Sequence, residues 1–441
     1  MAIVAKVARV VEALLNPWAE EVARDVPVVK RRRKFSPATL AQTFILGFLA
    51  KPRASDEDLA RMAARCGVPV TTQAVEQRFT QDTVDFLEAL FRRAIQQRLQ
   101  ADRTLAPRLE RFPAVFLQDA TAIVVPEELS DRFPGCGGSH GAGQAAIKLQ
   151  TRLDLKTGAL DAVSIEAGRD CDQRTPLQWD ASTPGALRIA DLGYFDTKVF
   201  HHLNTHQQFW ISRLAFGTEI FTREGAPIAR IDDLFAPAQV VVDQDILMGK
   251  DAKVPCRIVV WRVPHEVAAR RRRKLIAIAR DKGNPPPSQK RLDWCDWMIF
   301  VTNTPQELLS PREIGVLYRA RWQIELLFKR WKSLGAVAEM TGSTVIRRLV
   351  RFWSRLLAML IQHWVLQATA WGDCRCSLTK AWEAIREHAT HLAAACRDEE
   401  RLAAEIALIG DILKTTARRD KHKQPGTFEL LNDPTLPAYS P

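Results

Sequence analysis

The sequence predicts an α/β protein in which a mixed β-sheet, flanked by helices and interrupted by a β-rich insertion, lies between two all-helical regions. Apolar residues recur at helical spacing through the first hundred residues, become strand-like from about residue 112, and return to helical spacing beyond residue 341. A chain of 441 residues exceeds what one hydrophobic core usually organises, so we expect several domains.

The N-terminal region, residues 1–107, is predicted to be helical and to bind DNA through a helix-turn-helix. Ser55 is a good cap for the helix DEDLARMAAR, and Cys66 and Gly67 form a turn. A second helix then begins at Thr71 or Thr72 and would present four residues to a DNA groove: Thr72, Gln73, Gln77 and Arg78. An ordinary helical hairpin has the same pattern, so simple packing stays an alternative.

Residues 108–214 are predicted to form the first part of the sheet domain. AVFLQDATAIVV, AIKLQTRLDL and LDAVSIEAG have strand periodicity, and LRIADLGYF and FWISRL follow with a helix between them. Residues 215–296 are read as the β-rich insertion, with strands in PAQVVVDQDIL and CRIVVWRV. The sheet domain resumes over residues 297–340, beginning with the strand DWMIFVTN, and residues 341–441 are predicted to be helical.

The second part of the sheet domain contains a long helix with one carboxylate among cations. Ser310, Pro311 and Glu313 form a strong helix start, and Gly335 should end the helix. Five side chains fall within roughly 80° around its axis and form a polar stripe: Tyr318, Arg321, Glu325, Lys329 and Lys332. An intrahelical ion pair is the alternative reading of this pattern.

The charge balance indicates a polyanionic partner. The formal net charge is +12, and basic residues cluster at KRRRK (30–34), RRRRK (270–274) and RRLVRFWSR (347–355). Any single run could instead be a solvated surface. The N-terminus lacks the features of a secretory signal, no apolar run reaches membrane length, and the eight cysteines are scattered, so we expect a cytoplasmic protein.

Two aspartates follow strand-like runs: Asp119 in VFLQDAT and Asp191 in RIADLGY. Each one alone could cap a turn. Together with Glu325 they could hold a pair of hard divalent cations, because Mg²⁺ prefers carboxylate oxygens. The sequence therefore points to phosphoryl-transfer chemistry.

The spacing Tyr318-x2-Arg321-x3-Glu325-x6-Lys332 resembles the signature of transposases of the insertion sequence four family. DATAIVVPEELSDRFPGCGG, AIKLQTRLDLKTGAL and DLGYF are similar to that family's two aspartate regions, and VTNTP is similar to the strand before its glutamate helix. The resemblance covers about residues 110–350, with a weaker likeness in the N-terminal region.

This resemblance implies that Asp119, Asp191 and Glu325 are the DDE triad on an RNase H-like fold, binding two Mg²⁺ ions, with Mn²⁺ as a possible substitute. It implies phosphate contacts by Tyr318, Arg321 and Lys332, and Lys329 shares their stripe. The expected activity is cut-and-paste transposition: hydrolysis at the element's terminal inverted repeats, then joining of the 3′ ends to target DNA. The partners are double-stranded DNA and a second copy of the chain, which would pair through the C-terminal helices.

Members of this family with an inserted strand domain can stack a tryptophan on a flipped base, and the candidates here are Trp261, Trp294 and Trp297. The sequence does not choose among them, and a core role is the default for tryptophan. Of the histidines, the run His201, His202 and His206 lacks an evident third ligand. Two other functions stay open: a DNA-binding regulator that does not use the triad, and a nuclease or resolvase that cuts without joining.

Overall fold

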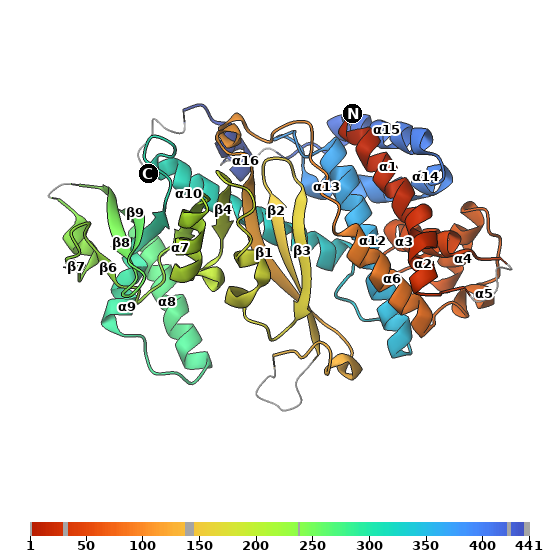
Figure 1. The fold of residues 1–441 in the computed structure, drawn as a ribbon, viewed down its shortest axis with the longest axis horizontal. Helices are drawn as coiled ribbons and strands as arrows, with labels where there is room; N and C mark the ends of the chain where they lie inside the picture. The colour runs from red at the N-terminus through yellow and green to blue at the C-terminus, as the bar shows by residue number, and fades with distance from the viewer. Residues whose placement is uncertain (1, 30–33, 137–144, 237–238, 421–424, 436–441) are drawn as a thin grey trace. The chain divides into compact units, whose positions relative to one another are not determined.

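The computed structural model describes residues 2–29, 34–136, 145–236, 239–420 and 425–435 (Figure 1). All but the last residue of the basic run at 30–34 lies outside these ranges. The chain forms two compact units. Unit one comprises residues 1–110, 119–171 and 322–425, and unit two comprises residues 111–118, 172–321 and 426–441.

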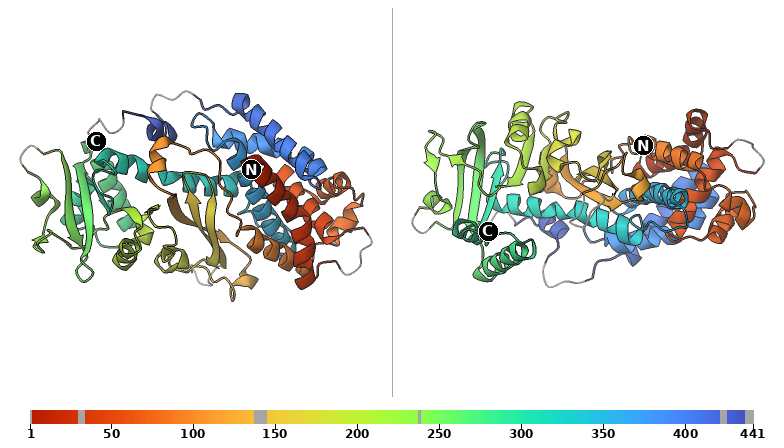
Figure 2. Two further views of the ribbon diagram at one scale, coloured as in Figure 1. Left: turned by 45° about the horizontal axis from the view of Figure 1, so that its top comes forward. Right: turned by 90° about the horizontal axis from the view of Figure 1, so that it is seen from below.

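Unit one contains most of the helices. The N-terminal ones are α1 (Ile3–Leu15), α2 (Pro17–Asp25), α3 (Pro37–Ala50), α4 (Asp56–Arg65), α5 (Thr72–Glu76) and α6 (Gln81–Ala94). The C-terminal ones are α11 (Trp322–Lys329), α12 (Val345–Thr369), α13 (Leu378–Glu387), α14 (Ala389–Ala395) and α15 (Glu399–Thr416). Helix α12 is buried on all sides along its second half and packs against α1, α3, α6 and α15, so N- and C-terminal segments share one core (Figure 2).

The α4–α5 pair has the local signals expected of it. Ser55 and Asp58 form a capping box at the start of α4, and Thr71 accepts a hydrogen bond from the amide of Ala74. Gly67 in the turn has φ +79°, a conformation that glycine adopts without strain. Helix α5 is only five residues long, and Gln77 and Arg78 lie just beyond it. Of the four proposed DNA contacts, Thr72, Gln73 and Gln77 are exposed, whereas Arg78 is half-buried.

Unit one also holds a short sheet. Strands β2 (Ala146–Asp154) and β3 (Leu160–Ala167) form an antiparallel hairpin beside β1 (Val115–Val124), in the order β3-β2-β1. Residues 119–124 of β1 belong to this unit, and residues 115–118 belong to unit two. The 3-10 turns η1 (Pro107–Arg111) and η2 (Glu127–Leu129) precede and follow β1.

Unit two is built around a mixed sheet in the order β1-β4-β5-β10-β9-β8-β6-β7. Strand β4 (Leu187–Ala190) is parallel to β1 and to β5 (Phe209–Arg213), whereas β10 (Trp297–Thr302) is antiparallel to β5. Strands β6 (Ile220–Phe221), β7 (Pro227–Ile228), β8 (Val241–Met248) and β9 (Val254–Arg262) come from the predicted insertion. They extend the sheet because β9 pairs with β10.

The helices of unit two are α7 (Thr197–Thr205), α8 (His265–Asp281), α9 (Gln289–Asp293), α10 (Pro311–Ala320) and α16 (Thr427–Asn432). Short 3-10 turns connect these elements: η3 (Asp172–Arg174), η4 (Pro176–Gln178), η5 (Leu192–Tyr194), η6 (Ile231–Leu234) and η7 (Trp294–Asp296). Helix α7 begins at Asp196, whose side chain accepts a hydrogen bond from the amide of Lys198. The predicted mixed α/β class, with a large mixed sheet and helices toward both ends of the chain, is confirmed.

The long glutamate helix differs from its prediction in regularity. It begins at Ser310 with the expected capping box and ends before Gly335, but α10 and α11 are separated at Arg321, which keeps right-handed helical angles. Residues Arg330–Leu334 (η8) form a π-helical turn, closed by a bond from the Gly335 amide to the Arg330 carbonyl at 3.0 Å. Burial of Arg330 and Trp331 accompanies this wider turn, a tertiary effect that helical periodicity does not report.

Gly335 is expected to be required for this turn. A Cβ atom at Gly335 would lie 2.1 Å from the Met359 sulfur and 2.7 Å from the Trp331 carbonyl oxygen. We therefore expect Gly335→Ala to lower the free energy of unfolding by about 1–3 kcal/mol, as overpacking does. Denaturant melts would measure the change. Gly410→Ala is the matched control. Gly410 lies within helix α15, and a Cβ atom there would stay 3.4 Å from the nearest atom of Thr369, so this substitution should be neutral or stabilising.

Candidate active site

In unit two, Asp191 lies directly after the short buried strand β4. It precedes η5, but its side chain makes no capping hydrogen bond, so capping does not explain its presence. One carboxylate oxygen is 3.9 Å from a guanidinium nitrogen of Arg321, and the Asp191 side chain is 50% exposed. The carboxylate is thus held at the strand end, next to a cation, and open to solvent.

Tyr318 and Arg321 are adjacent to this carboxylate. The Arg321 guanidinium lies 5.9 Å from the centre of the Tyr318 ring, and that ring packs against Phe300 of β10. Burial, together with the charge of Asp191, raises the pKa of Tyr318 to about 12. Tyr318 therefore keeps its hydroxyl proton at any physiological pH and can act as a hydrogen-bond donor.

Arg213 is a basic residue near this cluster that sequence reasoning missed. It ends strand β5, and its positive charge acts on Tyr318 in the direction opposite to burial, as Arg321 does. A cation at the end of a strand that pairs with β4 is a sequence signal that could have identified it. Unit two therefore gathers two arginines, a tyrosine and an aspartate around one strand end.

In unit one, Asp119 lies within strand β1 and is half-buried. One of its carboxylate oxygens accepts a hydrogen bond from the amide of Ala120 at 2.8 Å, which fixes the side-chain orientation. Asp119 therefore lies in a strand and does not cap a turn. Glu325, also in unit one, is half-buried in the first turn of α11, and Lys329 is exposed at the end of that helix.

Lys332 lies in the π-helical turn and donates a hydrogen bond to the carbonyl oxygen of Ala122 at 2.9 Å. Burial lowers the pKa of Lys332. Ala122 is three residues after Asp119 on strand β1, so Lys332 links the end of the glutamate helix to the strand that carries the first aspartate. This link is within unit one, and the sequence pattern alone does not reveal it.

The three candidate tryptophans have different surroundings. Trp297 is buried against Phe235 in the core, whereas Trp261 is half-buried and packs against Phe300. Trp294 is partly buried, contacts Phe216, and lies in the wall of a cavity of about 650 Å³ that Trp297 also lines. A base-stacking role for any of them stays a prediction.

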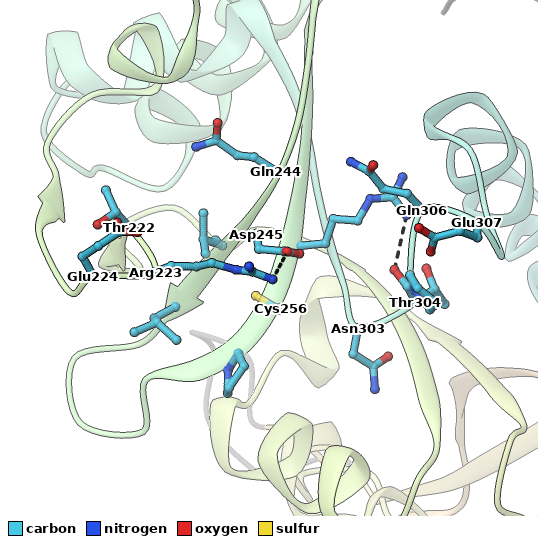
Figure 3. A pocket seen from close by; sticks show the side chains of 15 residues that line it. Thr222, Arg223, Glu224, Gln244, Asp245, Cys256, Asn303, Thr304, Gln306 and Glu307 are labelled. Atoms are coloured by element: carbon cyan, nitrogen blue, oxygen red, sulfur yellow. Dashed lines mark hydrogen bonds and ion pairs between the residues drawn. The ribbon is translucent and has the colours of Figure 1, made fainter.

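A larger polar cavity of about 920 Å³ lies among strands β6, β8 and β9 and the segment after β10 (Figure 3). Arg223 forms an ion pair with Asp245 across it, and Arg257 donates a hydrogen bond to the Thr304 carbonyl. None of the predicted carboxylates of the triad lines this cavity. Cavity size therefore does not identify the position of the proposed catalytic carboxylates.

A mixed α/β chain with one aspartate in a strand, another directly after a strand, and a helix carrying tyrosine, arginine, glutamate and lysine has the fold class and side-chain types of a DNA-processing enzyme. The family model described as "Transposase DDE domain" matches residues 110–361. The chain belongs to this family of DDE transposases, and the resemblance to the insertion sequence four family is confirmed.

Several relatives with assigned names are transposases of insertion sequence elements. The chain is 28% identical over 372 residues to the transposase for insertion sequence element IS231B of Bacillus thuringiensis subsp. berliner, covering 79% of this chain and 77% of that protein. It is 24% identical over 318 residues to the transposase for IS1151 of Clostridium perfringens, covering 67% and 66%. A putative transposase InsL of Escherichia coli K12, for IS186A, is 26% identical over 49% of this chain and 56% of that protein.

Membership gives the chain the general character of this family: transposases act on DNA, and DDE domains generally use divalent metal ions. One further property can be read from the helices. Among the residues that the structure describes, none of the helices combines the length and apolarity needed to cross a membrane.

Proposed function

We propose that this protein is a cut-and-paste transposase that hydrolyses phosphodiester bonds at the ends of its element and joins the freed 3′-hydroxyls to target DNA. Asp119, Asp191 and Glu325 are proposed as its catalytic carboxylates. The order of events follows from the chemistry, since a 3′-hydroxyl must be released before it can attack a second phosphodiester.

The strand register is the observation that carries this proposal. Within unit two, Gln118 of β1 is paired in parallel with Ala190 of β4. Asp119 and Asp191 are the next residues along these two strands. Neighbouring strands lie about 4.7–4.9 Å apart, so continued register would bring the two carboxylates side by side at the level where β4 ends. The β1-β4-β5 parallel order also supports the proposed RNase H-like fold.

The placement of Glu325 is supported by the Lys332 link. Lys332 is seven positions after Glu325 on the helix, which is about 10 Å at 1.5 Å per residue. Ala122 is three positions after Asp119 on the strand, which is also about 10 Å. A helix that runs along β1 in the strand's own direction would therefore carry Glu325 to the level of Asp119.

The donor set fits hard divalent cations. All three proposed ligands are carboxylates, and carboxylate oxygens suit Mg²⁺, with Mn²⁺ as a substitute. A pair of such ions supplies an activated water and neutralises charge on the departing oxygen. The hydrogen bond from the Ala120 amide orients Asp119. Arg321 and Tyr318 would grip the scissile phosphate by charge-assisted hydrogen bonds, and Lys329 and Lys332 would contact neighbouring phosphates.

DNA would be bound at further surfaces. The exposed residues of the α4–α5 pair are proposed to contact the terminal inverted repeats, and the C-terminal helices are proposed to pair two copies of the chain. Helix α8 supplies a third surface, because only Ala268 of its 17 residues is buried and it projects from the strands of its unit (Figures 1 and 2). Arg270, Arg273 and Lys274 are exposed on it.

Within α8 the arginines divide into two roles. Arg271 donates a hydrogen bond to the Trp297 carbonyl at 3.0 Å, and Arg272 forms an ion pair with Asp296. These two attach the helix to the sheet. Arg273 and Lys274 point to solvent and are proposed to contact DNA phosphates.

Replacing Arg273 and Lys274 together with alanine is therefore expected to weaken DNA binding and to reduce the slope of log K against log salt by about two. Binding measured across a salt series would show it. Arg271→Ala is the matched control, expected to reduce thermal stability with a smaller change in slope. An unchanged slope in the double variant would remove α8 from the DNA interface.

The proposal is tested by incubating the protein with a labelled element end, a target plasmid and Mg²⁺. Joined products that disappear with Asp119→Asn and with Glu325→Gln support transposition. Cleavage without joining would favour the nuclease or resolvase, and DNA binding without any metal-dependent product would favour the regulator.

A further inference from the structure

Two histidines and a glutamate converge in the C-terminal helices of unit one. His388 joins α13 to α14, His391 lies in the first turn of α14, and Glu405 comes from α15. One potential ligand atom from each lies within 4.8 Å of the others. The His388 Nδ1 atom is 2.9 Å from a Glu405 carboxylate oxygen, and the two imidazole rings are 5.5 Å apart.

The backbone fixes part of this arrangement. The amides of His391 and Leu392 both donate to the His388 carbonyl at 3.0 Å, so the two histidines are held on one tight turn. The side chains of His388 and Glu405 are largely buried, 19% and 16% exposed, whereas His391 is exposed. Packing therefore orders the side chains of His388 and Glu405, whereas the side chain of His391 is open to solvent.

We infer that His388, His391 and Glu405 form a binding site for a transition-metal ion of the Zn²⁺ type. Zinc is bound at about 2.0–2.2 Å by imidazole nitrogen and carboxylate oxygen, so tetrahedral ligand atoms lie a little over 3 Å apart. Small side-chain rotations would close the present spacing to that value. Three protein ligands leave a fourth position for water, on the exposed side of His391.

The ligand types separate this site from the proposed triad. Imidazole suits Zn²⁺, Co²⁺ and Ni²⁺, whereas Mg²⁺ prefers oxygen ligands alone. The inference therefore does not rest on the proposed function. Sequence spacing could not find this site, because His391 and Glu405 are on different helices and only the packing of α14 on α15 brings them together.

A plain ion pair between His388 and Glu405 is the competing explanation, with His391 as an ordinary surface residue. The two explanations differ in what His391 does. If His388 and Glu405 form only an ion pair, replacing His391 leaves zinc binding unchanged. If the three residues form a metal site, replacing His391 removes one of the three ligands. A bound ion would also fasten α14 to α15 and so raise the melting temperature of the protein.

The experiment uses the full chain with His202→Asn and His206→Asn as background, because these two rings, on α7 and directly after it, have centroids 4.0 Å apart and could bind zinc weakly. Zn²⁺ is titrated calorimetrically, and Co²⁺ is followed by its visible absorption. With excess Mg²⁺ present to occupy the proposed carboxylate site, we expect one Zn²⁺ ion per chain, a higher melting temperature with Zn²⁺, and no loss of Zn²⁺ binding to Mg²⁺. His391→Asn and Glu405→Gln should each weaken binding at least about tenfold.

His391 is exposed, so His391→Asn should fold as the background protein does, which melting in EDTA would verify. Zinc binding that is equally tight in His391→Asn would overturn the inference, as would a background protein that binds no zinc. Neither result depends on DNA cleavage, so the site and the transposase activity can fail separately.

Discussion

Asp191→Asn is expected to abolish strand cleavage while leaving binding to the element end nearly intact. Asparagine keeps the shape of the side chain but removes the negative charge that the proposed metal pair requires. Loss of metal-derived stabilisation of the transition state costs several kcal/mol, so cleavage should slow by about 10³-fold or more. Binding should persist because Arg321 can still contact the DNA phosphates.

Single-turnover cleavage of a labelled end measures the first effect, and a gel-shift titration measures the second. Asp196→Asn is the matched control: it makes the same chemical change five residues away, where asparagine caps α7 as well as aspartate does. Its activity should be unchanged. If Asp191→Asn cleaves at a normal rate, Asp191 is not a catalytic residue.

Arg321→Ala is expected to weaken end binding and cleavage together. The Arg321 side chain is 15% exposed and its guanidinium lies beside both Asp191 and Tyr318, so its removal eliminates a preorganised cation from the place where phosphate charge would develop. Removing one such donor typically costs about 10²–10³-fold in rate, and loss of a charge-assisted contact costs about tenfold or more in affinity.

Exposed Arg319, two residues earlier on α10, provides the control. Arg319→Ala should have little effect on either measurement. Arg321→Lys should recover part of the binding, because the charge returns without the planar two-pronged geometry. Normal binding with lost cleavage in Arg321→Ala would assign Arg321 to chemistry alone and contradict the division of roles with Asp191.

Local signals in the sequence predicted local structure well. Ser55 and Ser310 each begin a helix as capping residues, because the cap is made with an amide only three residues away. The strand runs around Asp119 and Asp191 were likewise predictable, since alternation and β-branched residues report a half-buried sheet. The Tyr-Arg-Glu-Lys spacing predicted the family, which the comparisons confirm.

Long-range effects could not be predicted in this way. The π-helical turn at Arg330–Leu334 accompanies the close approach of Gly335 to Met359 of α12, a residue more than twenty positions away. The strands of the insertion extend the sheet of unit two, which periodicity did not reveal, because the β9–β10 pairing joins segments separated by a whole helix. Sequence periodicity reports which face of an element is buried and does not report its partner.

The sequence by itself determined which side chains are available for chemistry: three carboxylates after or within predicted secondary structure, a basic stripe on one helix, and an overall positive charge. Tertiary structure decided which other residues contact each of these side chains. It placed Arg321 and Tyr318 next to Asp191, tied Lys332 to the strand of Asp119, and brought Glu405 to two histidines. Such contacts depend on how distant segments pack, and packing free energy is a property of the whole fold.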